Sequence, residues 1–240
     1  MYCDNFTIDF DEKTFNSVDI YNKLKQTGII LIKNYYNQKD IFELQNNFDL
    51  LFEKVIPFIE TAENLNNDRR IFNANNYVDF DIFANNKLFS DITTLYFSDH
   101  VKSYYSKNDF SQLYPMANIL KYNSEYNSNS GGTWHRDNHF GMIKTMLYLT
   151  DCYDDNGCLQ FLTNSSIDHI SIPQTSHKIN KRYNDDDIDI IRKTHTNIEL
   201  LNIIGKAGTI IILDASYIHR GNIIKSGQRN AITLYPYECK

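Results

Sequence analysis

The chain has 240 residues, of which 42% are hydrophobic, and this is enough to form a sizeable core in one domain of ordinary size. The formal net charge of -6 argues against a nucleic-acid partner, because a phosphate-binding surface needs clustered lysine and arginine. There is no signal sequence and no apolar run long enough to span a bilayer, and the four cysteines show neither CxxC spacing nor a dense disulfide pattern, so we expect a cytoplasmic protein with no membrane partner.

The N-terminal half, residues 1–112, is expected to be mostly helical. The helix-type apolar spacing and short apolar runs predict, in chain order, a strand at 5–10, a helix at 15–26, a strand at 29–32, a helix at 40–64 and a helix at 87–105. Gly28 should end the first helix, and Asp40 is the expected N-cap of the second. A stripe of apolar residues should form the buried face of that second helix: Ile41, Leu44, Phe48, Leu51 and Val55.

From residue 113 onward, short strands and turns replace the helical pattern. Residues 116–122 form the first expected core strand, with Asn118 and Leu120 on one face and Lys121 on the other. Further along, the acidic stretch 184–187 lacks the glycine and glutamate spacing of a calcium-binding EF-hand loop, so we interpret it as a solvated loop.

The stretch 131–139, GGTWHRDNH, contains the first candidate functional residues. Two glycines precede it and a strand-like run follows it, which favours an extended conformation over a helix. In an extended chain His135, Asp137 and His139 point to one face, whereas a helix would turn Asp137 away from both histidines. An imidazole and a carboxylate on one face can bind a divalent metal ion, but they need a further ligand.

That further ligand is expected at His219, which follows a buried apolar run and a turn. Two histidines and one aspartate form the facial triad of non-haem Fe(II) oxygenases, which leaves coordination positions open for a cosubstrate and O2. Ten residues later comes Arg229, whose planar guanidinium can hold a carboxylate by two hydrogen bonds.

This order of motifs, His-x-Asp, a long interval, His and then Arg, resembles the Fe(II)/2-oxoglutarate-dependent dioxygenases, and more narrowly the phytanoyl-CoA dioxygenase-like family. Two more stretches are similar to that family. Residues 148–162 look like its strand, acidic turn, glycine and second strand, and residues 205–209 look like its turn before the distal histidine. The resemblance covers roughly residues 114–237, about half of the chain.

The resemblance implies a mainly β fold with flanking helices. One domain over residues 1–240 would place a double-stranded β-helix, a cupin-like jelly roll, at 113–240, with a helical N-terminal buttress packed against one of its sheets. It further implies an enzyme that uses Fe(II), 2-oxoglutarate and O2 to oxidise a small-molecule substrate, releasing succinate and CO2. Because halogenating relatives lack the aspartate, Asp137 favours hydroxylation or another oxidation over halogenation.

The resemblance also assigns roles to individual residues. His135, Asp137 and His219 would hold the iron, and Arg229 would bind the distal carboxylate of 2-oxoglutarate. Relatives sometimes use a lysine of the first core strand for the same cosubstrate, which makes Lys121 a candidate. His139 would contact the substrate or support a metal ligand.

The sequence departs from the family in three places. Residues 164–166, Asn-Ser-Ser, stand where relatives often have Gly-Ser-His, and Ala231 and Gly221 stand where many have a small hydroxyl residue touching the cosubstrate. Three alternatives remain open: a protein or peptide hydroxylase, a cupin-like metal-binding protein without oxygenase chemistry, and an inactive relative that acts as an interaction module. No part of the sequence identifies an oligomeric interface.

Overall fold

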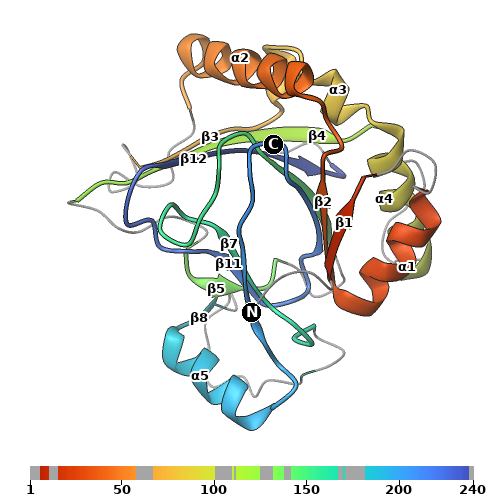
Figure 1. Ribbon diagram of the computed structural model, residues 1–240, viewed down its shortest axis with the longest axis vertical. Coiled ribbons are helices and arrows are strands. Elements are labelled where there is room, and N and C mark those ends of the chain that lie inside the picture. Colours follow the sequence, from red (N-terminus) through yellow and green to blue (C-terminus); the bar gives the residue numbers. More distant parts are fainter. Residues whose placement is uncertain are drawn as a thin grey trace.

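The computed structural model describes residues 6–10, 16–57, 67–100, 110, 112–124, 132–137, 142–166, 170 and 182–237. Two β-sheets lie face to face, as expected for a jelly roll, with helices outside them (Figure 1). The larger sheet has the strand order β1-β2-β10-β6-β12-β4-β3, and the smaller one has the order β8-β5-β11-β7-β9. No helix in these described segments is long and apolar enough to cross a membrane.

The elements follow one another along the chain with these bounds: β1 Thr7–Asp9, α1 Ser17–Thr27, β2 Ile29–Lys33, α2 Gln38–Lys54, β3 Asp68–Ile71, η3 Ala74–Asn76, α3 Asp81–Ala84, α4 Lys87–His100, β4 Tyr114–Lys121, β5 Trp134–His135, β6 Ile143–Tyr148, β7 Leu159–Leu162, β8 Arg182–Tyr183, α5 Asp185–Thr194, β9 Leu200–Ile203, β10 Ile210–Asp214, β11 His219–Gly221 and β12 Gln228–Tyr235.

Strand β2 shows how the layers are built. Its side chains alternate between faces, so Ile29 and Leu31 enter the core between the two sheets, while Ile30 and Ile32 enter the core between the large sheet and the helices. All four are fully buried, and each contributes roughly 1.5 to 3 kcal/mol to folding. A third core lies on the far side of the small sheet, where α5 covers Trp134 and Ile218.

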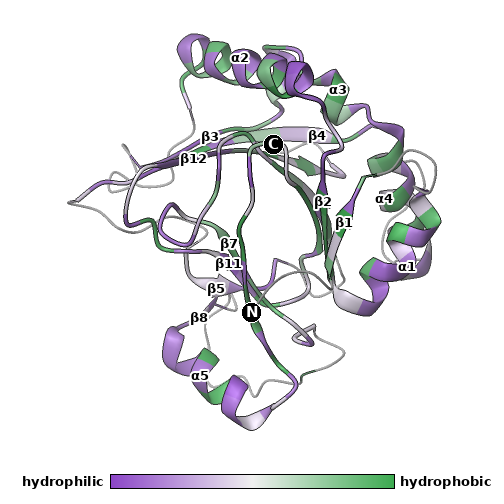
Figure 2. Ribbon diagram, in the orientation of Figure 1, coloured by the Kyte–Doolittle hydropathy of each residue, from purple (hydrophilic) through white to green (hydrophobic). Residues whose placement is uncertain are grey.

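The helices pack by the apolar stripes expected from the sequence. In α2, Ile41, Leu44, Phe48 and Leu51 are buried. In α1 the buried residues are Ile20, Tyr21 and Leu24, and Figure 2 shows hydrophobic and hydrophilic residues mixed along both helices. Helix α2 begins earlier than expected, because Asn37 rather than Asp40 is its N-cap. Asp40 is the third helical residue and completes a reciprocal capping box with Asn37.

The N-terminal half contributes more to the sheet than its sequence suggested. Strand β1 pairs with β2, β2 with β10, and β3 with β4, so the large sheet crosses the expected boundary at residue 113. The strand β3 was missed, because Asp68, Arg69 and Arg70 carry no apolar alternation.

The acidic stretch 184–187 was also interpreted wrongly. It is the N-cap and first turn of α5, in which the Asn184 side chain accepts a hydrogen bond from the Asp187 amide and the Asp187 carboxylate accepts one from the Asn184 amide. Acidic side chains stabilise a helix N-terminus through the helix dipole, so this is a capping signal and not a loop.

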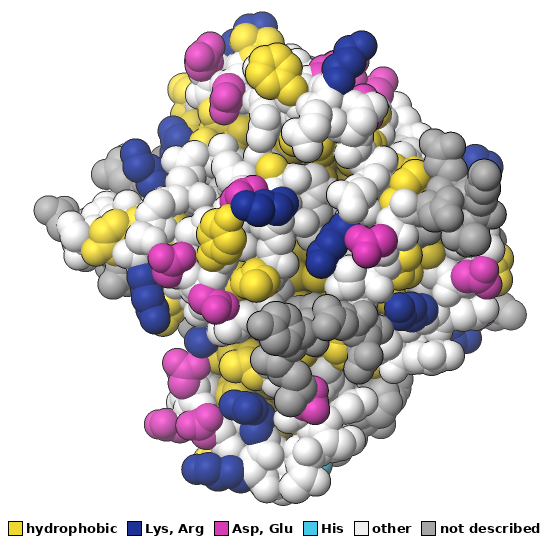
Figure 3. All heavy atoms as spheres, viewed as in Figure 1, with side chains coloured by type: hydrophobic (Ala, Val, Ile, Leu, Met, Phe, Trp, Pro, Cys, Tyr) yellow, Lys and Arg dark blue, Asp and Glu magenta, His cyan; other side chains and the backbone are white. Residues whose placement is uncertain are grey.

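On the face of the molecule in Figure 3, lysine and arginine side chains alternate with aspartate and glutamate across the described surface.

Candidate metal centre

Three side chains converge between the two sheets. Antiparallel pairing of β5 with β11 sets His135 opposite His219, and their ring centroids are 4.6 Å apart. Asp137 follows β5 by two residues, and its Oδ1 lies 3.3 Å from His135 Nε2 while its Oδ2 lies 3.7 Å from His219 Nε2. The ligand atoms of this triad all lie within 4.8 Å of one another.

Each imidazole is oriented by a backbone carbonyl two residues earlier in the chain. His135 Nδ1 lies 2.7 Å from Thr133 O, and His219 Nδ1 lies 2.9 Å from Tyr217 O. A carbonyl can only accept, so both Nδ1 atoms carry a proton, and in the neutral ring Nε2 is then the nitrogen with the free lone pair. This is the tautomer that metal-binding histidines require.

Electrostatics keep these donors in their ligating forms. Burial lowers the pKa of His219 to about 3, so the ring is neutral at physiological pH. The pKa of Asp137 is lowered well below its usual value because the positive charge of Lys144 outweighs the opposing effect of burial. Two imidazoles and a carboxylate suit a divalent ion, and the three ligand atoms lie close enough together to bind a single ion.

Residues 164–166, where the sequence departs from the family pattern, help to position this centre. The Ser165 hydroxyl donates to Leu162 O at 2.7 Å and accepts from the Ile218 amide at 2.8 Å, directly before His219. Arg136, buried on the face away from the metal centre, donates to Ser165 O at 2.6 Å. The turn therefore connects the segments that carry His135 and His219.

A cavity of about 230 Å³ opens beside the triad, and Arg229 lies in its wall. Arg229 is buried, and its terminal nitrogens donate to two neutral acceptors, Gly157 O at 2.5 Å and Asn118 Oδ1 at 3.0 Å. Its Nε has no hydrogen-bond partner among the described residues. An orphaned buried N–H on a permanent cation is a site for a carboxylate, which can bind along the Nε edge of the guanidinium.

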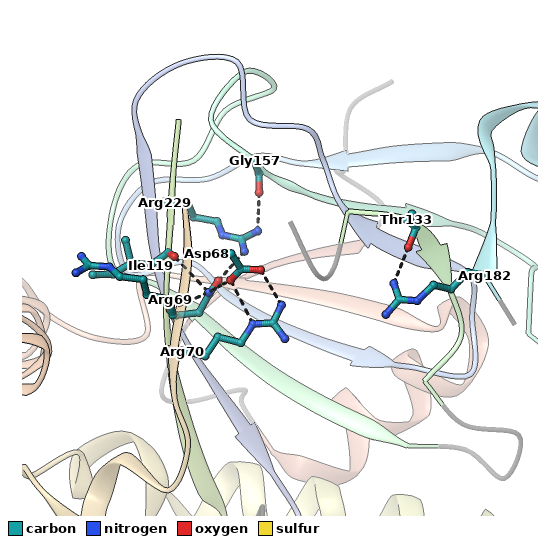
Figure 4. A network of polar contacts seen from close by, with 9 residues as sticks. Asp68, Arg69, Arg70, Ile119, Thr133, Gly157, Arg182 and Arg229 are labelled. Carbon is teal, nitrogen blue, oxygen red and sulfur yellow. Dashed lines mark hydrogen bonds and ion pairs between the residues drawn. The ribbon is translucent and has the colours of Figure 1, made fainter. Parts of the chain in front are cut away.

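A polar network holds Arg229 from below, as Figure 4 shows. Asn118 accepts from Arg229 and donates to Asp68 Oδ1 at 2.8 Å, and Asp68 in turn binds Arg70 through two hydrogen bonds. Across the cavity, Arg182 donates to Thr133 Oγ1 at 2.5 Å. Alternation along β4 indicated that Asn118 and Leu120 share a face, and both line the cavity; Asp68 and Arg70 could not be found, because their strand was not recognised.

Two candidates from the sequence do not join this arrangement. Lys121 ends β4 as an exposed residue and does not line the cavity, because alternation turns it away from Asn118 and Leu120. The structure therefore gives no support to a cosubstrate role for Lys121. His139 lies outside the described residues.

Several cavity residues had no role in the sequence analysis. Thr233 lines the cavity from β12, on the same face as Arg229 and two residues after Ala231, so a hydroxyl is present although Ala231 lacks one. Tyr235 lies beyond it. The most consequential omission is Lys144 of β6, whose Nζ forms an ion pair with Asp137 Oδ2. It stood within a strand-like run, where one lysine looks like an exposed residue.

A comparison with protein families confirms the resemblance. The sequence matches the phytanoyl-CoA dioxygenase (PhyH) family over residues 24–231, most of the chain. No curated protein matches the sequence.

Solved structures with the same fold are distant in sequence. The epimerase SnoN of nogalamycin biosynthesis, described as non-haem and α-ketoglutarate dependent, has a TM-score of 0.65 at 11% identity, covering 91% of this chain and 81% of SnoN. The carbocyclase SnoK of the same pathway has a TM-score of 0.61 at 12% identity, covering 95% and 85%. EctD from S. alaskensis, solved with 2-oxoglutarate and 5-hydroxyectoine, has a TM-score of 0.62 at 15% identity, covering 94% and 78%.

These likenesses support the double-sheet fold, and the family match reaches from α1 into β12, across the triad and Arg229. The chain therefore belongs to the phytanoyl-CoA dioxygenase family and is an enzyme of the Fe(II)/2-oxoglutarate-dependent oxygenase type.

Proposed function

We propose that His135, Asp137 and His219 hold Fe(II), that Arg229 binds the distal carboxylate of 2-oxoglutarate, and that the enzyme hydroxylates a small-molecule metabolite. The observation that carries this proposal is the convergence of two imidazoles and a carboxylate on one cavity whose wall also contains the Arg229 Nε, which has no hydrogen-bond partner among the described residues. When bound, the iron, 2-oxoglutarate and O2 supply the oxidation, with release of succinate and CO2.

In this proposal the side chains and backbone of the protein bind the metal ion and the cosubstrate and fix their orientation. The carbonyls of Thr133 and Tyr217 hold the imidazoles in the ligating tautomer, so the metal meets a preformed set of donors. Asn118 and Gly157 fix the guanidinium of Arg229, which sets the direction in which the cosubstrate extends from the metal. The apolar side chains of Met116, Met146, Leu159 and Leu213 line the same cavity and limit the access of water.

A small substrate is favoured by the size of the site. The cavity of about 230 Å³ is below the roughly 300 to 1,000 Å³ of many ligand pockets, so it suits a cosubstrate with the reacting part of a small molecule. SnoN has been solved with nogalamycin RO and EctD with 5-hydroxyectoine, both small molecules. Two buried unpaired thiols, Cys152 and Cys158, are consistent with the reducing cytoplasm as the site of action.

The test is an anaerobic titration of the metal-free protein with Fe(II) and then 2-oxoglutarate, followed by the visible metal-to-ligand charge-transfer band and, after admission of air, by succinate release. We expect the band and succinate with the wild type and neither with Asp137→Ala. Asp151→Ala is the matched control, because Asp151 lies outside the cavity and pairs with Lys206.

An Asp137→Ala variant that keeps the band would overturn the assignment of the triad. A wild type that binds iron without forming the band would favour a cupin-like metal-binding protein. Turnover of peptides in preference to metabolite pools would instead identify a protein hydroxylase.

A further inference from the structure

Lys144 places a buried cation directly at the metal centre. It projects from β6 into the cavity, where its Nζ is bound to Asp137 Oδ2 and lies 5.3 Å from the ring centroid of Tyr235. Only 14% of the Lys144 side chain and 15% of the Asp137 side chain are exposed. Metal binding and cosubstrate binding, as proposed above, assign no task to this ammonium group.

The acids around the cavity cannot compensate for both Lys144 and a metal ion. Asp68 and Asp137 are the carboxylates among the described residues that line it, and Asp68 is already bound to Arg70. Asp137 is therefore the counter-ion of Lys144 and also the only anionic ligand of the triad. The Lys144 ammonium and the metal ion therefore compete for the same buried carboxylate.

The charge balance changes with each ligand. Lys144 and Asp137 are neutral as a pair, and Arg229 in the same wall is bound only to neutral acceptors, so a divalent ion adds two positive charges to a poorly solvated site that already holds a cation. Doubly charged 2-oxoglutarate offsets the two charges that the ion adds. Lys144 thus opposes metal binding in the absence of the cosubstrate and opposes it far less in its presence.

We propose that Lys144 is a built-in competing cation that makes metal binding conditional on the cosubstrate. The ammonium group holds Asp137 in place while the centre is empty, lowers the affinity for a divalent ion alone, and couples the two ligands so that metal and dianion bind together. By thermodynamic linkage, the factor by which 2-oxoglutarate tightens metal binding equals the factor by which the metal tightens 2-oxoglutarate binding. This inference rests on the proposed function.

The test compares Mn(II) affinity at one pH by calorimetry, without and with saturating 2-oxoglutarate. In the wild type, the cosubstrate should tighten Mn(II) binding by about tenfold or more, within the usual range of coupling between sites. In Lys144→Gln, which keeps a hydrogen-bond donor and removes the charge, Mn(II) alone should bind about tenfold more tightly, and the enhancement by 2-oxoglutarate should shrink to a few-fold.

Lys206→Gln is the control for loss of a lysine charge, since Lys206 forms an exposed ion pair with Asp151, at 2.6 Å, away from the triad. It should retain the wild-type affinity and coupling. If Lys144→Gln binds Mn(II) alone no more tightly than the wild type, or shows undiminished enhancement, the inference about Lys144 is wrong while the proposed function stands. If the wild type shows neither the enhancement nor the charge-transfer band, both are wrong.

Loss of Lys144 leaves the Asp137 carboxylate buried without its partner, so the variant is expected to unfold at a lower temperature without metal. Mn(II) alone should then raise its melting temperature more than it raises that of the wild type, because the ion takes over the role of the ammonium group. A Lys144→Gln protein that neither Mn(II) nor Mn(II) with 2-oxoglutarate can stabilise would show that Lys144 has a purely structural role, and would overturn the inference.

Discussion

His135 and His219 are direct partners across the β5–β11 pair, so the two imidazoles of the candidate metal centre are brought together by one antiparallel contact although 84 positions of sequence separate them. His219 is the more buried of the two, with 5% of its side chain exposed against 15% for His135. This difference in burial has a consequence for stability that can be measured.

The metal-free protein should become less stable as the pH is lowered, because of His219. Its folded pKa of about 3 lies below the usual value of 6.5, so the unfolded chain binds a proton between those values that the folded chain does not. Stability is therefore complete above pH 6.5 and falls as pH decreases toward 3, by up to about 1.4 kcal/mol per pH unit. Urea unfolding from pH 7 to 4 should show a steeper loss in the wild type than in His219→Gln. If the stability of the wild type and of His219→Gln depended on pH in the same way, His219 would not be the cause of the loss.

Replacement of Arg229 should weaken cosubstrate binding more than metal binding. Arg229→Gln removes a buried charge from a carboxylate, a loss of about 2 to 5 kcal/mol, or roughly 30- to 1,000-fold and more in affinity. The measurement is the concentration of 2-oxoglutarate that half-saturates the charge-transfer band. Arg192→Gln, an exposed residue of α5, is the control and should be unchanged. Equal half-saturation in both variants would remove Arg229 from the cosubstrate site.

The Ser165 hydroxyl should matter both for folding and for the metal. Ser165→Ala deprives the buried Ile218 amide of its acceptor, at a cost of about 1 to 3 kcal/mol. Because His219 is the next residue, metal affinity should also fall, by about 10- to 100-fold as for other residues that orient metal ligands. Ser226→Ala, which removes an exposed contact to Asp155, should change stability by less than about 0.5 kcal/mol. Thermal melts and Mn(II) titration test both parts.

Two glycines separate backbone strain from steric conflict. Gly28 and Gly227 have φ angles of +75° and +68°, but a Cβ at Gly28 would lie 2.5 Å from the Tyr217 ring, whereas at Gly227 its nearest neighbour is 3.9 Å away. Gly227→Ala should cost about 1 to 2 kcal/mol for the left-handed conformation. Gly28→Ala should cost about 1 to 3 kcal/mol more, because the Tyr217 ring must move. Equal melting temperatures for the two variants would refute this account.

The convergence of the candidate metal ligands could be predicted from the sequence, because they lie in short motifs of metal-binding residue types. His135 and Asp137 are two residues apart on an extended segment, and His219 follows a long apolar strand, so residue type and alternation were sufficient. Arg229 was found by its distance from His219. The expected cosubstrate role of Lys121 came from the same strand that correctly placed Asn118, although alternation itself turns Lys121 outward.

The rest of the cavity depends on pairings between distant segments. Asp68 reaches Asn118 only because β3 adds to the edge of the large sheet, and a polar four-residue strand gives no periodic signal. Lys144 is indistinguishable from a surface lysine until β6 is placed beside β10 and β12, which buries it against Asp137. Whether a charged side chain such as Lys144 is buried depends on how the strands assemble, so it cannot be predicted from the neighbouring sequence.

The hydrogen bonds from His135 to Thr133 O and from His219 to Tyr217 O use the main chain, which every amino acid possesses. Substitution of the side chain at position 133 or 217 therefore leaves the carbonyl in place. The ligating tautomer is inherited from the path of the backbone, so sequence drift around the centre is tolerated wherever that path is preserved. In proteins that share this fold at very low identity, the orientation of the imidazoles can persist while the residues that supply it change.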